Sequence, residues 1–370
     1  MFKLETTEVW NAEFFSHFVN LKNELHKNIK NFLSEDIEDY AKFFKEDSPF
    51  HKSFKWRGFL VYKNNQVMAK AVLCWKEGDT QGNLGFLDWR NDLDAAKFLR
   101  DEVFRFAREI SLSSLKTPID INFFINFRVR LPTKNGPLYG EPTYPDYYCK
   151  MFEDLEFDVV GKWDVFQIRK WNTIVNFRKQ RKKNESSGLK HFGEIKLRPI
   201  NIKEWDRELE ILYRLFHESY KVMADFEPLT YPQFKLLFDK FKYIANPLYS
   251  YIAELDGHPV GFGINYPDPQ NVLKSIHGKK LGIFGKALAL LRLRLNFGDF
   301  IIAHVGRIPG PNGEEIKGLQ AKISKRLTQR AFFMRRAFTI QKSDALSKRA
   351  WDKENYKTYA QYVLYGKNLK

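Results

Sequence analysis

The order of helices and strands expected from the sequence occurs twice along the chain, and this repeat limits the possible folds more than any other feature. Each half predicts early helical structure, a β-hairpin, a strand, a helix, a strand, a helix and a closing strand. Residue identity between the halves is low, so the repeat lies in the order of the elements. With 370 residues, the chain is long enough for two domains, each with its own core.

The first half carries clear local signals for these elements. Apolar residues from Phe14 to Leu25 recur at spacings of three and four, which predicts a helix. A β-hairpin is expected over 59–75 and a strand over 83–89. An amphipathic helix follows over 94–110, with Asp92 or Asp94 as its N-cap. Further β structure is expected at 119–124, a helix over 144–155 and a strand over 163–168.

The second half repeats the order after a basic segment. We expect a strand over 195–200, helices over 204–220 and 231–244, and a hairpin around the Asp256–Gly257 turn. A strand over 300–307 leads into a loop rich in Gly and Pro and then into a helix over 319–330. A short strand near Phe338, a helix over 345–351 and a strand over 358–365 complete the half.

These elements predict an α+β fold with two tandem domains, each a mixed, mostly antiparallel sheet flanked by helices. We place the first domain at 1–170 and the second at 195–370. The segment 171–194 between them contains five basic residues in the six from Arg178 to Lys183 and is expected to be a linker.

Composition limits the partners. The net charge of +16 favours anionic ligands such as a nucleotide cofactor, an acidic membrane face or RNA, although it can also serve solubility alone. The two cysteines, Cys74 and Cys149, form neither a disulfide framework nor a zinc motif, so we expect no metal. The N-terminus shows no secretory signal, and no segment has the about 20 mostly apolar residues of a membrane span. A cytoplasmic protein is expected.

The element order and several short stretches resemble bacterial tandem GNAT proteins, which are acyl-CoA N-acyltransferase-like. In the first half the matching stretches are 83–88, Arg128 and 140–148; in the second they are 267–273, 278–282 and 359–365. The loop from Gly306 to Ala321 stands where this family binds the pyrophosphate of coenzyme A. In such a loop, backbone N–H groups and the positive end of the following helix face the anion.

The resemblance implies a site for acetyl-CoA or a longer acyl-CoA in the second half. At the three positions that the family's phosphate motif marks, this chain has Glu315, Gly318 and Gln320, two of which depart from the motif. The cofactor-binding residues that we expect are Val305, Gly306, Arg307, Gly313, Lys317, Gly318 and Leu319. Between Trp89 and Leu93 the first half has no comparable loop, so we expect that half to be non-catalytic and to shape the acceptor site.

Acyl transfer to an amine needs a proton acceptor, a donor to the oxyanion and an acid near the leaving sulfur. The resemblance places the oxyanion donor at a backbone N–H near Val305 or Gly306, and the acid at Tyr356 or Tyr359. For the base we consider His304 first and Glu254 second. His304 can equally be a hydrogen-bonded core or surface histidine, and Glu254 a solvated carboxylate at a strand edge.

The acceptor is expected to be a small-molecule amine or a lipid amine. The basic, apolar stretch from 271 to 297 can form a helix on an anionic membrane face, a lid over the acyl site or an ordinary core helix. Two other functions remain open. One is a non-catalytic binding or scaffold protein, and the other is a FemX-like transferase that uses aminoacyl-tRNA, although no RNA-binding motif supports nucleic acid as a partner.

Overall fold

The computed structural model describes residues 1–30, 32–169, 194–221, 226–245, 247, 249–269, 272–273, 275, 282–294, 298–309, 334–342 and 357–369. It divides into two compact units, one formed by Met1–Trp163 with Ala360–Lys370 and the other by Asp164–Tyr359. The last eleven residues, which we expected in the second domain, therefore belong to unit 1. The physical reason is that the final strand, β15 (Lys357–Asn368), pairs antiparallel with β5 of unit 1 from Tyr365 to Asn368.

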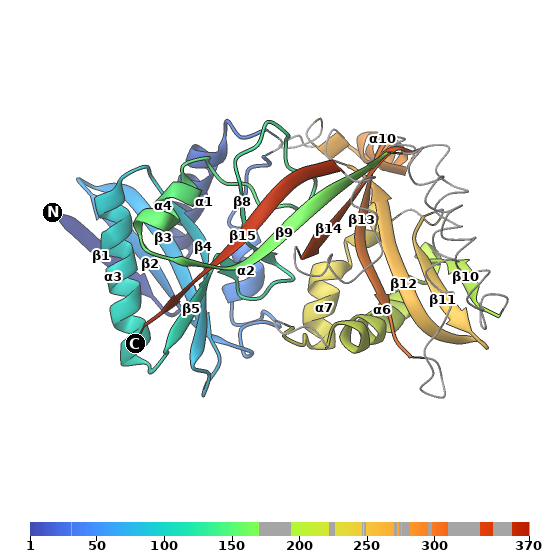
Figure 1. The fold of residues 1–370 in the computed structure, drawn as a ribbon, viewed down its shortest axis with the longest axis horizontal. Coiled ribbons are helices and arrows are strands. Elements are labelled where there is room, and N and C mark those ends of the chain that lie inside the picture. The colour runs from blue at the N-terminus through green and yellow to red at the C-terminus, as the bar shows by residue number, and fades with distance from the viewer. Residues whose placement is uncertain are drawn as a thin grey trace. The chain divides into compact units, whose positions relative to one another are not determined.

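Unit 1 is a sheet with helices on both faces (Figure 1). Its strands follow the order β1-β2-β3-β4-β5-β15, and only β4 and β5 run parallel within the β1–β5 series. Its elements are β1 (Phe2–Thr7), α1 (Ala12–His26), α2 (Glu38–Phe44), β2 (Lys55–Lys63), β3 (Gln66–Trp75), β4 (Gln81–Trp89), α3 (Leu93–Glu109), β5 (Ser114–Thr117), β6 (Ile119–Asp120), β7 (Asn126–Phe127), β8 (Val129–Arg130), α4 (Tyr148–Asp154) and the start of β9 (Asp158–Arg169).

The alternation of side chains along β3 explains the two layers of helices in unit 1. Ala69, Ala71 and Leu73 pack in one core with residues of α3 such as Leu99. On the other face, Lys70 lies against Phe18 of α1. Every residue from Met68 to Cys74 is buried, because the strand is covered on both sides.

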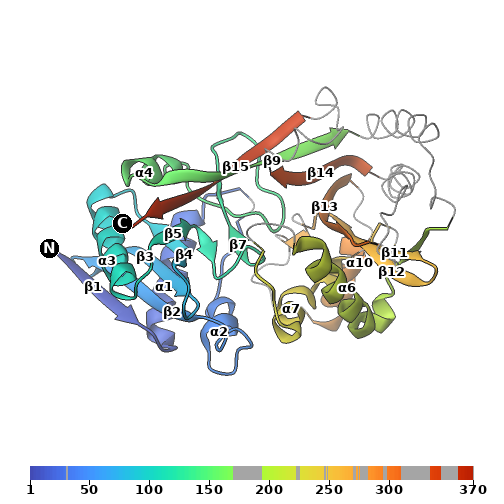
Figure 2. The ribbon, with the colours of Figure 1, turned by 60° about the horizontal axis from the view of Figure 1, so that its bottom comes forward.

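Unit 2 repeats this plan over a sheet with the order β14-β13-β12-β11-β10, in which only β13 and β14 run parallel. The helix α6 lies across β12 and β13 (Figure 2). Its elements are β10 (Lys196–Pro199), the 3-10 helix η1 (Ile202–Glu204), α6 (Trp205–Tyr220), α7 (Tyr231–Phe238), α8 (Phe241–Ile244), β11 (Tyr251–Leu255), β12 (His258–Pro267), α10 (Ile283–Arg294), β13 (Gly298–Arg307) and β14 (Met334–Lys342).

Each unit is thus a mixed sheet flanked by helices, and the predicted α+β class is confirmed. Some local predictions were incomplete: β1 was not expected, the strand expected at 119–124 is only the two-residue β6, and the helix expected over 231–244 is divided into α7 and α8. The helices expected at 319–330 and 345–351 lie outside the described residues.

Candidate active site

The edge of β13 in unit 2 carries His304, Val305 and Gly306, where the sequence predicts the reacting groups. On one side β13 pairs with β12 as far as Arg307. On the other, within the part of the chain that the structure describes, it pairs with β14 only from Gly298 to Ile302. An irregularity in the β12 pairing falls between Ile302 and His304. Such bulges bend a strand and interrupt its pairing, which leaves backbone groups available next to a site.

The register shows which backbone groups point outward from this edge. Ile308 donates its N–H to the carbonyl of Val260 at 2.9 Å. Because bonding to one neighbour alternates along an antiparallel strand, Gly306 and His304 also face β12. The N–H of Val305 therefore points away from β12, toward the side where the pairing with β14 has ended. Such a donor can stabilise the oxyanion of a tetrahedral intermediate.

The helix α6 contributes to the same edge. The hydroxyl of Tyr220 lies 3.5 Å from the Val305 carbonyl oxygen, at the limit of a hydrogen bond. Burial raises the pKa of Tyr220, which keeps its hydroxyl protonated. No local pattern marks Tyr220, because it reaches β13 only through the packing of α6 on the sheet.

His304 packs against aromatic side chains beside this edge. Its ring centroid is 5.1 Å from that of Phe216 and 5.5 Å from that of Phe238. Burial lowers the pKa of His304 from its usual value near 6.5 to about 4. The imidazole is therefore neutral at physiological pH and has a free acceptor nitrogen in either tautomer.

Gly306 follows on β13, next to Ser219 of α6. A Cβ added at Gly306 would lie 2.3 Å from Cε1 of Phe262 and 2.7 Å from Oγ of Ser219. The neighbouring side chains Val305 and Arg307 are exposed. A glycine at 306 thus lets α6 approach the strand without displacing Phe262.

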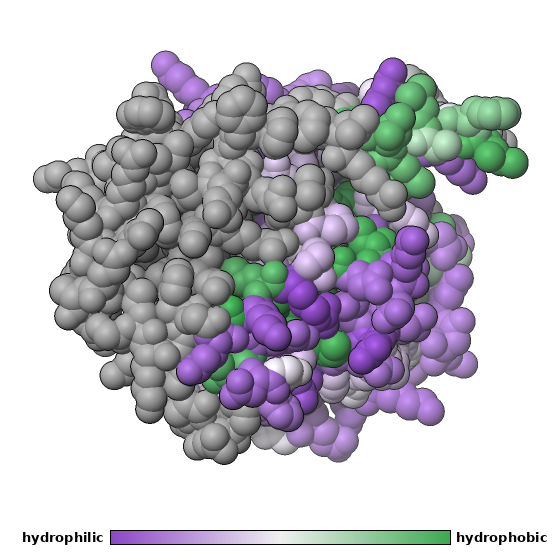
Figure 3. All heavy atoms as spheres, turned by 90° about the vertical axis from the view of Figure 1, so that its right-hand side faces the viewer, coloured by the Kyte–Doolittle hydropathy of each residue, from purple (hydrophilic) through white to green (hydrophobic). Residues whose placement is uncertain are grey.

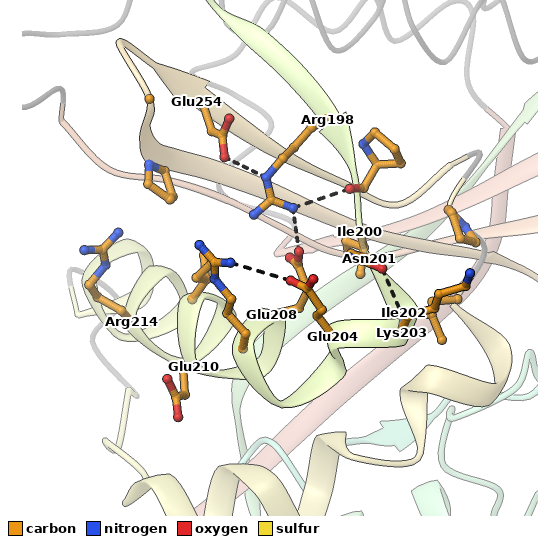
Figure 4. A pocket seen from close by; sticks show the side chains of 16 residues that line it. Arg198, Ile200, Asn201, Ile202, Lys203, Glu204, Glu208, Glu210, Arg214 and Glu254 are labelled. Carbon is orange, nitrogen blue, oxygen red and sulfur yellow. Dashed lines mark hydrogen bonds and ion pairs between the residues drawn. The ribbon is translucent and has the colours of Figure 1, made fainter.

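Glu254, the second base candidate, lies in a groove of about 1170 Å³ between β10–β11 and the start of α6 (Figure 4). Arg198 bridges the two carboxylates there, with its Nε 2.6 Å from Glu254 and its Nη1 2.6 Å from Glu208. On the sheet Glu254 lies opposite Pro259, whereas His304 pairs with Ile264. The structure therefore does not bring the two candidates together, and Glu254 already accepts a charged hydrogen bond.

Only some of the other predicted residues lie within the described part of the chain. Tyr359 is half-buried in β15. Tyr356, Gly313, Lys317, Gly318 and Leu319 lie outside the described residues.

The corresponding edge of unit 1 is filled by the protein's own side chains. There β4 pairs with β5 from Gln81 to Asn83. Farther along β4, Trp89 donates its N–H to the hydroxyl of Tyr148 at 3.1 Å, and its carbonyl accepts from Tyr147 at 2.7 Å. Asp120 accepts the N–H of Phe86 at 2.5 Å. These contacts occupy outward backbone groups of β4, whereas the N–H of Val305 on β13 is open among the described residues.

The turn from β4 into α3 also disfavours a bound phosphate. Asp92 caps α3 by accepting the N–H of Ala95 at 3.0 Å. Lys63 lies 3.0 Å from the same carboxylate. The first turn of α3 therefore already holds an anion, and a second one would meet like charge.

A buried polar network in unit 1 was not predicted from the sequence. Asp88 lies 2.7 Å from Nε2 of His26 and 3.1 Å from Nζ of Lys70. Lys70 donates to the hydroxyl of Tyr40 at 3.0 Å. Burial raises the pKa of Asp88, but the charges of Lys70 and His26 outweigh burial and hold the pKa well below its usual range. No local signal marks this network, since its members come from α1, α2, β3 and β4.

The described residues include neither a metal-binding cluster nor a membrane-spanning helix. They contain no group of three or more His, Cys, Asp or Glu side chains arranged to hold a metal ion. None of the helices in the described ranges is long and apolar enough to cross a membrane.

Comparison with known proteins gives one sequence relative and several structural ones. No model of a known protein family matches the chain. Protein YghO of Escherichia coli (strain K12) is 20% identical over 290 residues, which are 75% of this chain and 72% of that protein.

Solved structures resemble the whole chain at low sequence identity. A tandem GNAT protein from the clavulanic acid biosynthesis pathway has a TM-score of 0.52 at 10% identity, covering 100% of this chain and 99% of that one. A protein of unknown function from Enterococcus faecalis V583, described as a probable N-acyltransferase, has a TM-score of 0.53 at 8% identity and 100% and 73% coverage. A GCN5-related N-acetyltransferase from Anabaena variabilis ATCC 29413 has a TM-score of 0.51 at 11% identity, with 100% and 73% coverage. The chain has the fold of the tandem GNAT proteins.

Proposed function

We propose that the protein is an acyl-CoA-dependent N-acyltransferase whose reacting centre lies at the β13 edge of unit 2. The amine nitrogen attacks the thioester carbonyl carbon and forms the new C–N bond. The C–S bond then breaks, the amine gives up a proton to a base, and the thiolate takes a proton from an acid. The acyl donor is acetyl-CoA or a longer acyl-CoA, and the acceptor is a small-molecule or lipid amine.

The observation that carries this proposal is the difference between the two units at equivalent edges. In unit 1, Tyr147 and Tyr148 occupy the outward backbone groups of Trp89. In unit 2, the N–H of Val305 has no such partner among the described residues, and the pairing of β13 with β14 has ended at Ile302. The asymmetry supports a reacting centre in unit 2 and a structural or acceptor-shaping role for unit 1.

We assign roles to the predicted residues on this basis. The N–H of Val305 would bind the oxyanion, and neutral His304 would accept the amine proton directly or through water. Tyr356 or Tyr359 would protonate the thiolate. The segment with Gly306, Arg307, Gly313, Lys317, Gly318 and Leu319 would hold the phosphates of coenzyme A. Because Glu254 is engaged by Arg198, we favour His304 over Glu254 as the base.

A proline at position 305 tests whether the N–H of Val305 binds the oxyanion. Val305→Pro removes only an N–H that faces away from β12, so the ladder with β12 is kept. Val305→Ala is the matched control, because the side chain is 40% exposed and the alanine keeps the N–H. We expect Val305→Pro to lower the rate of acyl transfer about 100-fold or more, as the loss of an oxyanion donor does elsewhere. The alanine variant should remain close to the native rate.

Full activity of Val305→Pro would exclude this oxyanion site. No transfer by the native protein from any acyl-CoA would favour the scaffold alternative. Transfer from aminoacyl-tRNA alone would favour the FemX-like alternative, which shares the architecture but not the donor.

We further propose that α10 contacts an anionic membrane face. Phe284, Leu288 and Leu291 share one helix face at spacings of four and three, and they are 91%, 48% and 52% exposed. Apolar side chains project near the top of the face shown in Figure 3, where α10 lies in Figure 1. This exposure argues against the core-helix alternative. The net charge of +16 complements an acidic surface.

Sedimentation with lipid vesicles tests this contact. The native protein should sediment with vesicles that contain phosphatidylserine more than with neutral ones. Phe284→Ser with Leu288→Ser should remove the binding, whereas Leu236→Ser, a 36% exposed residue on α7, should keep it. Equal binding by the double variant would rule out α10 as the contact.

A further inference from the structure

Two arginines beside β8 in unit 1 have buried donors that find no hydrogen-bond partner among the described residues. Arg128 precedes the strand and is only 8% exposed, and Arg130 ends it half-buried. The unpartnered atoms are Nε of Arg128, and Nε and Nη2 of Arg130. Buried polar groups in native proteins are nearly always hydrogen-bonded, so a cluster of unpartnered donors requires an explanation.

The backbone holds Arg128 in an uncommon conformation. Its φ is +70°, in the left-handed region that residues other than glycine seldom adopt. Its N–H donates to the Pro118 carbonyl at 3.0 Å, which fixes the residue in this position. Such strain persists only when the surroundings impose it, and it gathers at binding sites.

Aromatic rings position the guanidinium group. Its central carbon lies 4.4 Å from the ring centroid of Phe127 and 4.7 Å from that of Tyr362. Contact with ring faces leaves the N–H donors at the edge of the planar group free to bind other groups. The rings therefore orient Arg128 without using its hydrogen bonds.

Arg130 belongs to the same cluster, because β15 brings Tyr362 directly opposite it. Arg130 donates from Nη1 to the carbonyl of Asn135 at 2.9 Å, which leaves its other donors unused. Tyr362 thus neighbours both arginines. Arg130 is half-buried as a residue, whereas its unpartnered Nε and Nη2 are buried.

The charge of the cluster is not neutralised by an ion pair. Among the described residues, neither arginine has a carboxylate within ion-pair distance. Burial lowers the pKa of Arg128, and Tyr362 and Glu141 offset this only in part. A buried charge is costly unless it is paired, and a planar oxyanion matches the fork of an arginine.

We propose that Arg128 and Arg130 form a binding site in unit 1 for the carboxylate or phosphate group of a small ligand. Carboxylate and phosphate share the recognition chemistry, two or three oxygens that accept from guanidinium N–H groups. The site does not depend on acyl transfer in unit 2, so either can exist without the other.

Thermal unfolding of the full chain tests the site with inorganic phosphate and with succinate as separate probes. Both are used at low millimolar concentration and constant ionic strength, because concentrated phosphate stabilises proteins without binding. We expect at least one probe to raise the Tm by roughly 3 °C. The probe with the larger shift identifies the favoured oxyanion.

Variants test whether Arg128 and Arg130 are responsible for the rise in Tm. Arg128→Gln and Arg130→Gln should each abolish the shift, and Arg130→Gln alone suffices if the strained position 128 does not tolerate replacement. Arg105→Gln is the matched control, since this arginine is exposed on α3 and paired with Glu102 and Glu109. It should respond like the native protein. No shift in the native protein, or an unchanged shift in Arg130→Gln, would overturn the proposal.

Thermal stabilisation by acetyl-CoA distinguishes the arginine site from the proposed acyl-CoA site in unit 2. Both arginine variants should keep the stabilisation by acetyl-CoA that the native protein shows. A native protein that responds to phosphate or succinate but not to any acyl-CoA would contradict the proposed transferase and leave the arginine site intact.

Discussion

At the scale of single residues, the most consequential group is Asp88. Its carboxylate accepts from Tyr148 at 2.9 Å in addition to its contacts with His26 and Lys70. Asp88 and Lys70 are 2% and 0% exposed. A charge buried this deeply is stable only while its partner is present.

We therefore predict that Asp88→Asn lowers the free energy of unfolding by about 3–5 kcal/mol, because it leaves the ammonium of Lys70 uncompensated. Chemical denaturation measures the change. Asp101→Asn is the control, since Asp101 is 62% exposed beside Arg100 and its ion pair should contribute no more than about 1 kcal/mol. Similar losses in the two variants would show that the network is not as buried as described.

His304 predicts a dependence of stability on pH. Its pKa is near 6.5 when unfolded and about 4 when folded. The folded state therefore binds its proton less readily, and the stability is fully present above pH 6.5 and is lost as the pH falls toward 4. From pH 7 to pH 5 the loss should be about 2 kcal/mol.

His304→Phe, which keeps an aromatic ring against Phe216, should remove this part of the pH dependence. Unfolding of both proteins at the two pH values measures it. The same low pKa predicts that the rate of acyl transfer shows no loss between pH 8 and pH 6 from protonation of His304. An identical pH dependence of unfolding in the two proteins would mean that the histidine is solvated.

At the scale of elements, β13 depends on close packing with α6. The ring of Phe262 stacks on Phe216 at 4.5 Å between the centroids, and Gly306 borders this pair. A methyl group at position 306 would overlap Phe262. The position therefore fixes how near α6 lies to the candidate site.

Gly306→Ala should lower the free energy of unfolding by about 1–3 kcal/mol through overpacking. It should also reduce acyl transfer, because the shift of Phe262 or β13 moves the N–H of Val305. Gly282→Ala is the control, since no atom lies within 4 Å of a Cβ built there. Denaturation and a transfer assay measure both effects, and native behaviour of Gly306→Ala would contradict this packing.

Elements governed by local interactions could be predicted from the sequence. Asp92 caps α3 as its position before an amphipathic run indicated. The Asp256–Gly257 turn has the positive φ values, 49° and 77°, that a tight hairpin requires. The strand β1 was missed because six residues pairing with a distant strand leave little local pattern.

The candidate site could be predicted only in part, for the same physical reason. His304 and Val305 lie on a strand with a clear local pattern, so their position near the end of β13 followed from the element order. Tyr220 and the blocking residues Tyr147 and Tyr148 act through contacts between segments far apart in the chain. Such contacts depend on tertiary packing, which no spacing within one segment encodes.

At the scale of the whole molecule, one fold occurs twice with different surroundings at the equivalent strand. Unit 1 fills the edge of β4 with tyrosine hydroxyls and caps α3 with Asp92. Unit 2 leaves the N–H of Val305 open among the described residues. Although the fold is duplicated, this difference between the units predicts a single acyl-CoA site in each chain.

Isothermal titration of the full chain with acetyl-CoA, and with a long-chain acyl-CoA if the first does not bind, tests this claim most directly. We predict one acyl-CoA bound per chain. The stoichiometry should be the same in Asp92→Asn, which changes only the N-terminal end of α3 in unit 1. Two molecules per chain would show that unit 1 also binds the donor. No binding by either ligand would contradict the transferase itself.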